Sequence, residues 1–150
     1  MHITAKVDYA VRAVLEVAAR GDTVTGADLA AAQDIPAKFL ETILAQLTRA
    51  GILVSHRGPA GGYGLARPAE RVSIADVVRA IDGPLAAVRG LPPEEVEYPG
   101  SAEGLRDVWI AARSGLRQAL ESVSVSDVLA GTIPPPAAEL LRADGAYRRR

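Results

Sequence analysis

The stretch 49–67, RAGILVSHRGPAGGYGLAR, constrains the fold of this chain more than any other segment. A helical pattern ends at Gly51, a short apolar run follows over 52–54, and a tip rich in glycine and proline leads back to apolar residues. This order predicts a helix, a strand, a tight hairpin and a second strand. The tip carries His56 and Arg57 on a backbone that glycine allows to approach another molecule closely.

Three helical patterns precede the hairpin, over 3–20, 25–33 and 36–50. Thr25 is a natural N-cap of the second helix. Pro36 keeps the residue before it out of helical geometry, so a tight turn joins the second and third helices into a helix-turn-helix. The second helix of such a pair is the recognition helix. In it we expect an inward face made of Phe39, Leu40, Ile43, Leu44 and Leu47.

The second half of the chain predicts more helix. Ser73 caps a pattern over 73–82, and Ser101 opens a long amphipathic pattern over 101–121 whose apolar face needs a partner, most simply a second copy of the chain. The expected organisation is mainly α with a small β-hairpin: a winged helix-turn-helix over 1–84, a loop over 85–100, a dimerisation helix with a short docking helix over 101–131, and a flexible tail over 132–150.

Composition excludes several classes of protein. The 150 residues contain no cysteine, which removes disulfides, thiolate nucleophiles and Cys-ligated zinc. No long uncharged apolar run and no signal-peptide pattern is visible, so we expect a cytoplasmic protein without a membrane span. The sequence has no phosphate-binding glycine motif and no nucleophile–histidine–acid arrangement, so we expect neither an enzyme nor a cofactor. The net charge of −1 means that any nucleic-acid contact must be local.

Five blocks of the sequence carry a family resemblance. They lie at 3–6 with 9–13 (ITAK and YAVRA), at 35–44 (IPAKFLETIL), at 47–53 (LTRAGIL), at 55–63 (SHRGPAGGY) and at 72–84 (VSIADVVRAIDGP). Together they resemble the Rrf-type winged-helix transcription regulators, the family of IscR, NsrR and CymR. The resemblance implies a homodimeric, sequence-specific regulator, most simply a repressor, that binds a palindromic operator in double-stranded DNA.

The resemblance also implies roles for single residues. The start of the third helix would enter the major groove with Lys38 and Glu41, and Arg57 would reach the minor groove. Phosphates would be held by Lys6, Tyr9, Thr25, His56 and the wing glycines Gly58, Gly61 and Gly62. The dimer interface would lie on the long helix, at Leu105, Val108, Trp109, Ala112, Leu116 and Leu120.

The sensor is where the chain departs from the family pattern. Many members carry three cysteines before the long helix that bind an iron–sulfur cluster, whereas 85–100 has none. No metal site is expected. The signal is left open between a small molecule and a partner protein. A ligand pocket would involve Asp8, Tyr98, Arg106 and Trp109.

A second function also fits the sequence. Winged helices bind proteins as well as DNA, and the near-neutral charge is compatible with a protein-interaction module that lacks sequence-specific DNA binding.

Overall fold

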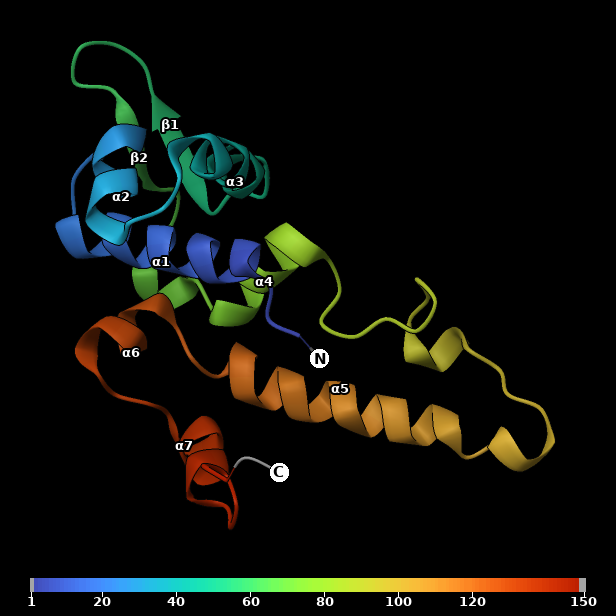
Figure 1. Ribbon diagram of the computed structural model, residues 1–150. Coiled ribbons are helices and arrows are strands. Elements are labelled where there is room, and N and C mark those ends of the chain that lie inside the picture. Colours follow the sequence, from blue (N-terminus) through green and yellow to red (C-terminus); the bar gives the residue numbers. More distant parts are fainter. Residues whose placement is uncertain (1, 149–150) are drawn as a thin grey trace.

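The computed structural model describes residues 2–148 and has a mainly helical architecture with one small hairpin (Figure 1). Helix α1 (Ala5–Arg20) lies at the centre and packs against α2 (Gly26–Gln33), α3 (Ala37–Arg49), α4 (Ile74–Asp82) and α6 (Val125–Ala130). Its inward face is built from Val7, Ala10, Ala13, Val14 and Val17. The helix predicted over 3–20 is therefore confirmed, although it begins at Ala5 with Thr4 as its N-cap.

Polar residues mark both ends of α2, the first helix of the helix-turn-helix. Thr25 caps α2 with its side chain, as predicted, and Asp34 closes the helix in the left-handed region at φ 50°. Pro36 then precedes α3, whose amide N–H groups at Phe39 and Leu40 both donate to the Pro36 carbonyl oxygen, at 2.9 and 3.0 Å. Four of the five residues expected to face inward are buried in α3, but Phe39 is 51% exposed, so its inward assignment was wrong.

The hairpin follows α3 as expected. Strands β1 (Leu53–His56) and β2 (Gly62–Leu65) pair antiparallel, with Leu53 opposite Leu65 and His56 opposite Gly62. A contact that the sequence did not indicate supports β2 near the turn. Val24, in the connection between α1 and α2, exchanges backbone hydrogen bonds with Tyr63 at 3.0 and 2.8 Å. The hairpin is thus attached to the helical core as well as to α3.

The C-terminal part departs from the expected boundaries. Helix α5 (Leu105–Glu121) starts four residues later than predicted, because Gly100–Ala102 forms a separate 3-10 turn and Ser101 caps no helix. The loop between α4 and α5 is not wholly exposed, since Leu85 and Val96 are buried. Within the expected flexible tail, helix α7 (Pro135–Arg142) forms and packs against α5. The last two residues of that tail, 149–150, lie outside the described residues.

Candidate nucleic-acid interface

The exposed start of α3 lies beside the N-terminal turns of α1. Lys38 and Glu41 are both exposed, as a recognition helix requires. Lys6 of α1 and Lys38 line one small hollow of about 220 Å³ together with Phe39 and Thr42. Two cations from different helices therefore converge at the point where α3 begins.

Tyr9 belongs to the same surface. Its half-buried ring meets the ring of Phe39 edge to face, with centroids 6.2 Å apart and an interplanar angle of 87°. The Arg12 guanidinium also lies over the Tyr9 ring, 5.6 Å from its centroid. Tyr9 thus packs against protein with its ring, while its position on α1 leaves it beside the two lysines.

Thr25 already has a structural task. Its hydroxyl accepts the Asp28 amide N–H at 3.1 Å and donates to the Asp28 carboxylate at 2.7 Å. The structure therefore assigns this side chain first to capping α2. A phosphate contact by Thr25 would have to share the hydroxyl with that cap.

The hairpin tip projects from one end of the molecule (Figure 1) and exposes Arg57. The fold favours glycine at all three wing positions, for different reasons. A Cβ at Gly61 would lie 2.5 Å from the His56 carbonyl oxygen, and one at Gly62 would lie 2.5 Å from the Val24 carbonyl oxygen. The Gly61 amide donates to the Gly58 carbonyl at 2.9 Å. At Gly58 a Cβ would meet no described atom within 4 Å beyond the two adjacent residues, but its φ of +107° lies in the region that favours glycine.

His56 lies apart from the lysines. It lines a polar hollow of about 280 Å³ that also contains Asp22 and Thr23, at the C-terminal end of α1. The residues expected to touch DNA therefore do not form one cluster: Lys6 and Tyr9 lie with the start of α3, Thr25 lies at the start of α2, and His56 lies at the turn end of the hairpin with Arg57 and the wing glycines.

The residues expected at the dimer interface lie on α5, which is only partly packed against the rest of the protomer. None of the 17 residues of α5 is buried. Val108 is 55% and Trp109 is 38% exposed, whereas Leu105 and Leu116 are half-buried and Ala112 is exposed. A helix with an apolar face this open is incompletely packed within one chain.

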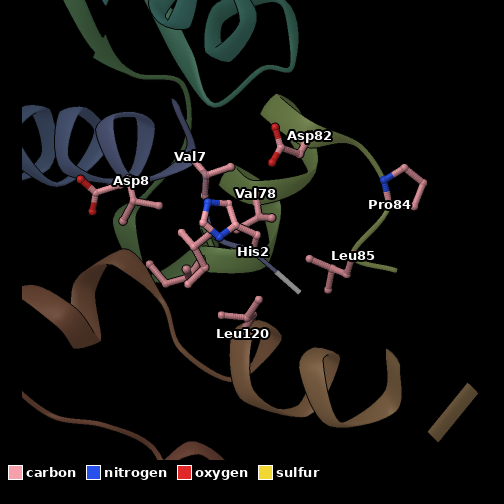
Figure 2. A pocket seen from close by; sticks show the side chains of 11 residues that line it. His2, Val7, Asp8, Val78, Asp82, Pro84, Leu85 and Leu120 are labelled. Carbon is pink, nitrogen blue, oxygen red and sulfur yellow. The ribbon is translucent and has the colours of Figure 1, made fainter. Parts of the chain in front are cut away.

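The expected ligand-pocket residues do not form one cluster. Trp109 donates its indole N–H to the Tyr98 hydroxyl at 3.1 Å and lines a hollow of about 710 Å³ beside 84–89. Asp8 pairs with Arg12 at 3.3 Å and lines a different, apolar hollow of about 340 Å³. Figure 2 shows this second hollow, where Leu120 of α5 projects toward α4. Arg106 lines neither hollow.

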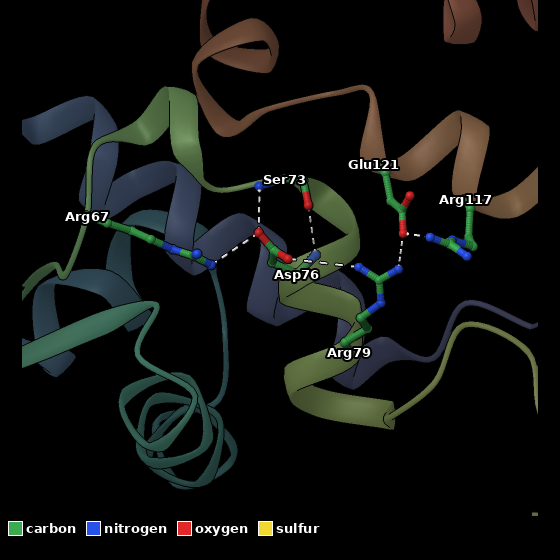
Figure 3. A network of polar contacts seen from close by, with 6 residues as sticks. All are labelled: Arg67, Ser73, Asp76, Arg79, Arg117 and Glu121. Atoms are coloured by element: carbon green, nitrogen blue, oxygen red, sulfur yellow. Dashed lines mark hydrogen bonds and ion pairs between the residues drawn. The ribbon is translucent and has the colours of Figure 1, made fainter.

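One polar network was missed entirely by sequence reasoning. Asp76 pairs with Arg67 at 3.1 Å, just after β2, and more distantly with Arg79 at 3.9 Å. Arg79 also pairs with Glu121 at the end of α5, and Arg117 pairs with Glu121 at 3.0 Å (Figure 3). Hydrogen bonds from Arg79 and then Arg117 lower the pKa of Glu121. The four-residue spacing of Arg117 and Glu121 predicts an ion pair on one helix. No pattern in the sequence predicts that α4 packs against α5.

These elements define a class of protein. A helix-turn-helix whose second helix leads directly into a two-stranded hairpin is a winged helix-turn-helix. Residues 3–131 match the model of the Rrf2 family, described as an iron-dependent transcriptional regulator. The chain therefore belongs to the Rrf2 family of transcriptional regulators, which confirms the resemblance seen in its sequence.

Individual relatives agree with this assignment. A candidate HTH-type transcriptional regulator of Mycobacterium tuberculosis is 47% identical over 93% of this chain and 88% of its own. Among solved structures, CymR of B. subtilis, described as the global cysteine regulator, superposes with a TM-score of 0.74 at 25% identity, over 88% of this chain and 98% of that one. IscR of T. potens gives 0.70 at 25% identity, over 87% and 88%.

The residues of this chain do not match the iron dependence in the family description. The sequence has no cysteine, and across residues 2–148 no group of three or more His, Asp or Glu side chains is placed to hold a metal ion. No metal-based step is therefore assigned to this chain. No helix within these residues is long and apolar enough to cross a bilayer.

Proposed function

We propose that this chain is a homodimeric, sequence-specific DNA-binding regulator that represses transcription from a palindromic operator. The observation that carries the proposal is the pairing of an exposed recognition-helix start with a projecting arginine-tipped hairpin. Lys38 and Glu41 would meet base edges in the major groove, where Glu41 accepts from a cytosine amino group. Arg57 would enter the minor groove. Since the named relatives are bacterial proteins and bacterial DNA lies in the cytoplasm, the proposal includes a cytoplasmic location.

The test uses duplexes selected from a random pool by binding to the full chain. Arg57→Ala should weaken binding to a site with A/T-rich flanks more than to one with G/C-rich flanks, because A-tracts have a narrow, strongly negative minor groove. Arg142→Ala, an exposed arginine on α7, is the matched control and should leave both affinities unchanged. Equal losses on the two flanks would refute the minor-groove role.

Dimerisation through α5 is the second part of the proposal. Helix α5 carries Val108, Ala111, Ala112, Gly115 and Ala119 along one side, a run of small side chains that lets a second helix approach closely. Such a pairing would set two recognition helices about one DNA turn, roughly 34 Å, apart.

Gly115 gives this part a clean test. Gly115 is exposed, and a Cβ there meets no described atom within 4 Å beyond its own stretch of helix, so a side chain at this position starts into open space in the isolated protomer. Gly115→Trp should therefore reduce the dimer to monomers in analytical ultracentrifugation, together with a loss of operator binding. Ser114→Trp, placed toward solvent on another side of the helix, should remain dimeric. A dimeric Gly115→Trp variant would place the interface elsewhere.

The proposal leaves the signal to be identified by experiment. The hollow beside Trp109 is the most suitable place for a small-molecule effector, because it combines apolar walls with the Arg89 cation and the Tyr98–Trp109 hydrogen bond nearby. Native mass spectrometry of the purified chain should show a retained non-metal ligand if the signal is chemical. A ligand-free chain that co-purifies with a second protein would favour a protein signal.

A further inference from the structure

Phe39 is the chain's only phenylalanine, and it lies exposed where a buried residue was expected. It is the third residue of α3, and 51% of its surface is exposed. A single exposed apolar side chain is ordinary by itself. Phe39 differs in its position, because residues at the N-terminal end of a recognition helix are those that reach base edges.

The ring is held in place by protein. Its edge-to-face contact with Tyr9 fixes it from one side, and the Phe39 amide is anchored to the Pro36 carbonyl at 2.9 Å. Tyr9 is itself packed against the hydrophobic core. A ring that is already oriented loses little conformational freedom when it meets a partner.

The surroundings of the ring select a polyanion as that partner. Lys6 and Lys38 line the same hollow as Phe39, with the Thr42 side chain completing it. An apolar protein surface would gain nothing from two flanking cations. A nucleic-acid groove offers phosphates to the cations and, between them, an apolar group on the edge of one base.

We propose that Phe39 reads the C5-methyl group of a thymine in the major groove. The thymine methyl is the apolar feature of that groove, and phenylalanine is among the side chains that contact it. The inference rests on the proposed function and deepens it, since it adds a specificity-determining residue to Lys38 and Glu41. It predicts one position in each half-site where thymine is preferred for its methyl group.

The test removes the methyl from the DNA rather than from the protein. Each thymine of a selected operator duplex is replaced singly by deoxyuridine, symmetrically in both half-sites, and binding is measured by fluorescence polarisation. Deletion of one methyl contact should weaken wild-type binding by about fourfold per half-site, from about 0.8 kcal/mol per buried methyl-sized group. Other thymines should be nearly neutral.

Substitutions of Phe39, measured with the same duplexes, complete a double-mutant cycle. Phe39→Ala should bind the thymine duplex more weakly and should show no further loss with deoxyuridine at the sensitive position. Phe39→Tyr, which preserves the packing on Tyr9, should retain the sensitivity. Leu140→Ala, an exposed apolar residue on α7, serves as the control and should behave as wild type.

The outcomes separate this inference from the proposed function. Absence of salt-dependent, sequence-selective binding by the wild type would overturn both. Selective binding with no deoxyuridine-sensitive position would overturn the role of Phe39 alone. A Phe39→Ala variant that keeps the full deoxyuridine effect would do the same, because another side chain would then contact the methyl.

Discussion

Substitution of Gly62 tests whether the wing glycines serve the fold before they serve any ligand. Gly62→Ala would place a Cβ 2.5 Å from the Val24 carbonyl oxygen and 2.7 Å from its carbon, with further crowding by Thr23. The obstacle is mainly backbone, so it cannot rotate away. Gly62 also has φ +153°, where a side chain is strained.

The expected cost follows from what must move. Relief of the overlap separates Val24 from Tyr63 and weakens two backbone hydrogen bonds, each worth about 0.5–1.5 kcal/mol net. Backbone strain adds about 1–3 kcal/mol if the overlap is only partly relieved. We expect a total of about 2–6 kcal/mol. For a chain of this size each kcal/mol lowers Tm by about 2–4 °C, so Tm should fall by roughly 4–24 °C.

The assay is thermal and urea unfolding followed by circular dichroism, with Gly64→Ala as the matched control. Gly64 lies in the same strand, and its Cβ would come no closer than 3.8 Å to His56, an ordinary contact. Gly64→Ala should be neutral or slightly stabilising, since glycine weakens a strand interior. Equal stabilities of the two variants would refute the reasoning that Val24 dictates glycine at position 62.

Two further predictions concern the helices around Asp76. Because the folded state holds the pKa of Glu121 below its ordinary value of 4.5, the ion pair should stabilise the fold fully above that pH and lose its contribution as the pH falls through the lowered pKa. Glu121→Gln should therefore flatten the pH dependence of unfolding below about pH 4.5, and an unchanged slope would argue against the pairing with Arg79. Ser73→Ala removes the hydroxyl that accepts the Asp76 amide N–H in the α4 capping box. Urea unfolding should therefore show a loss of about 1 kcal/mol in the free energy of unfolding. Ser101→Ala, whose side chain caps no helix, should show almost none.

Local signals in the sequence predicted much of the fold. Thr25 and Ser73 were identified as N-caps from residue type and spacing alone, because capping involves neighbours three residues apart. The same reasoning gave a wrong N-cap at Ser101, because Gly100, with φ +57°, and Ser101 belong to a separate turn before α5. Helix α7 was missed because the run 134–136 reads as a breaker, although proline is favoured in the first turn of a helix.

The sequence predicted only part of the candidate site, because the site depends on contacts between segments that are distant in the chain. Phe39 lies at the edge of the apolar stripe of α3, where the pattern does not decide between burial and exposure, and its contact with Tyr9 joins two different helices. Gly62 reads as a turn glycine, whereas its constraint comes from Val24, which belongs to another part of the chain. The periodicity of apolar residues describes one helix or strand at a time, so it predicts neither of these two contacts between segments.

The ion-pair network from Arg67 to Arg117 implies an uneven stiffness in the molecule. The hairpin is fastened to the core by backbone hydrogen bonds and close packing, which leave it little freedom. Helix α5 has no buried residue, and exposed ion pairs such as Arg79 with Glu121 hold only weakly. Helix α5 is therefore expected to shift relative to α4 more readily than the hairpin shifts relative to the core.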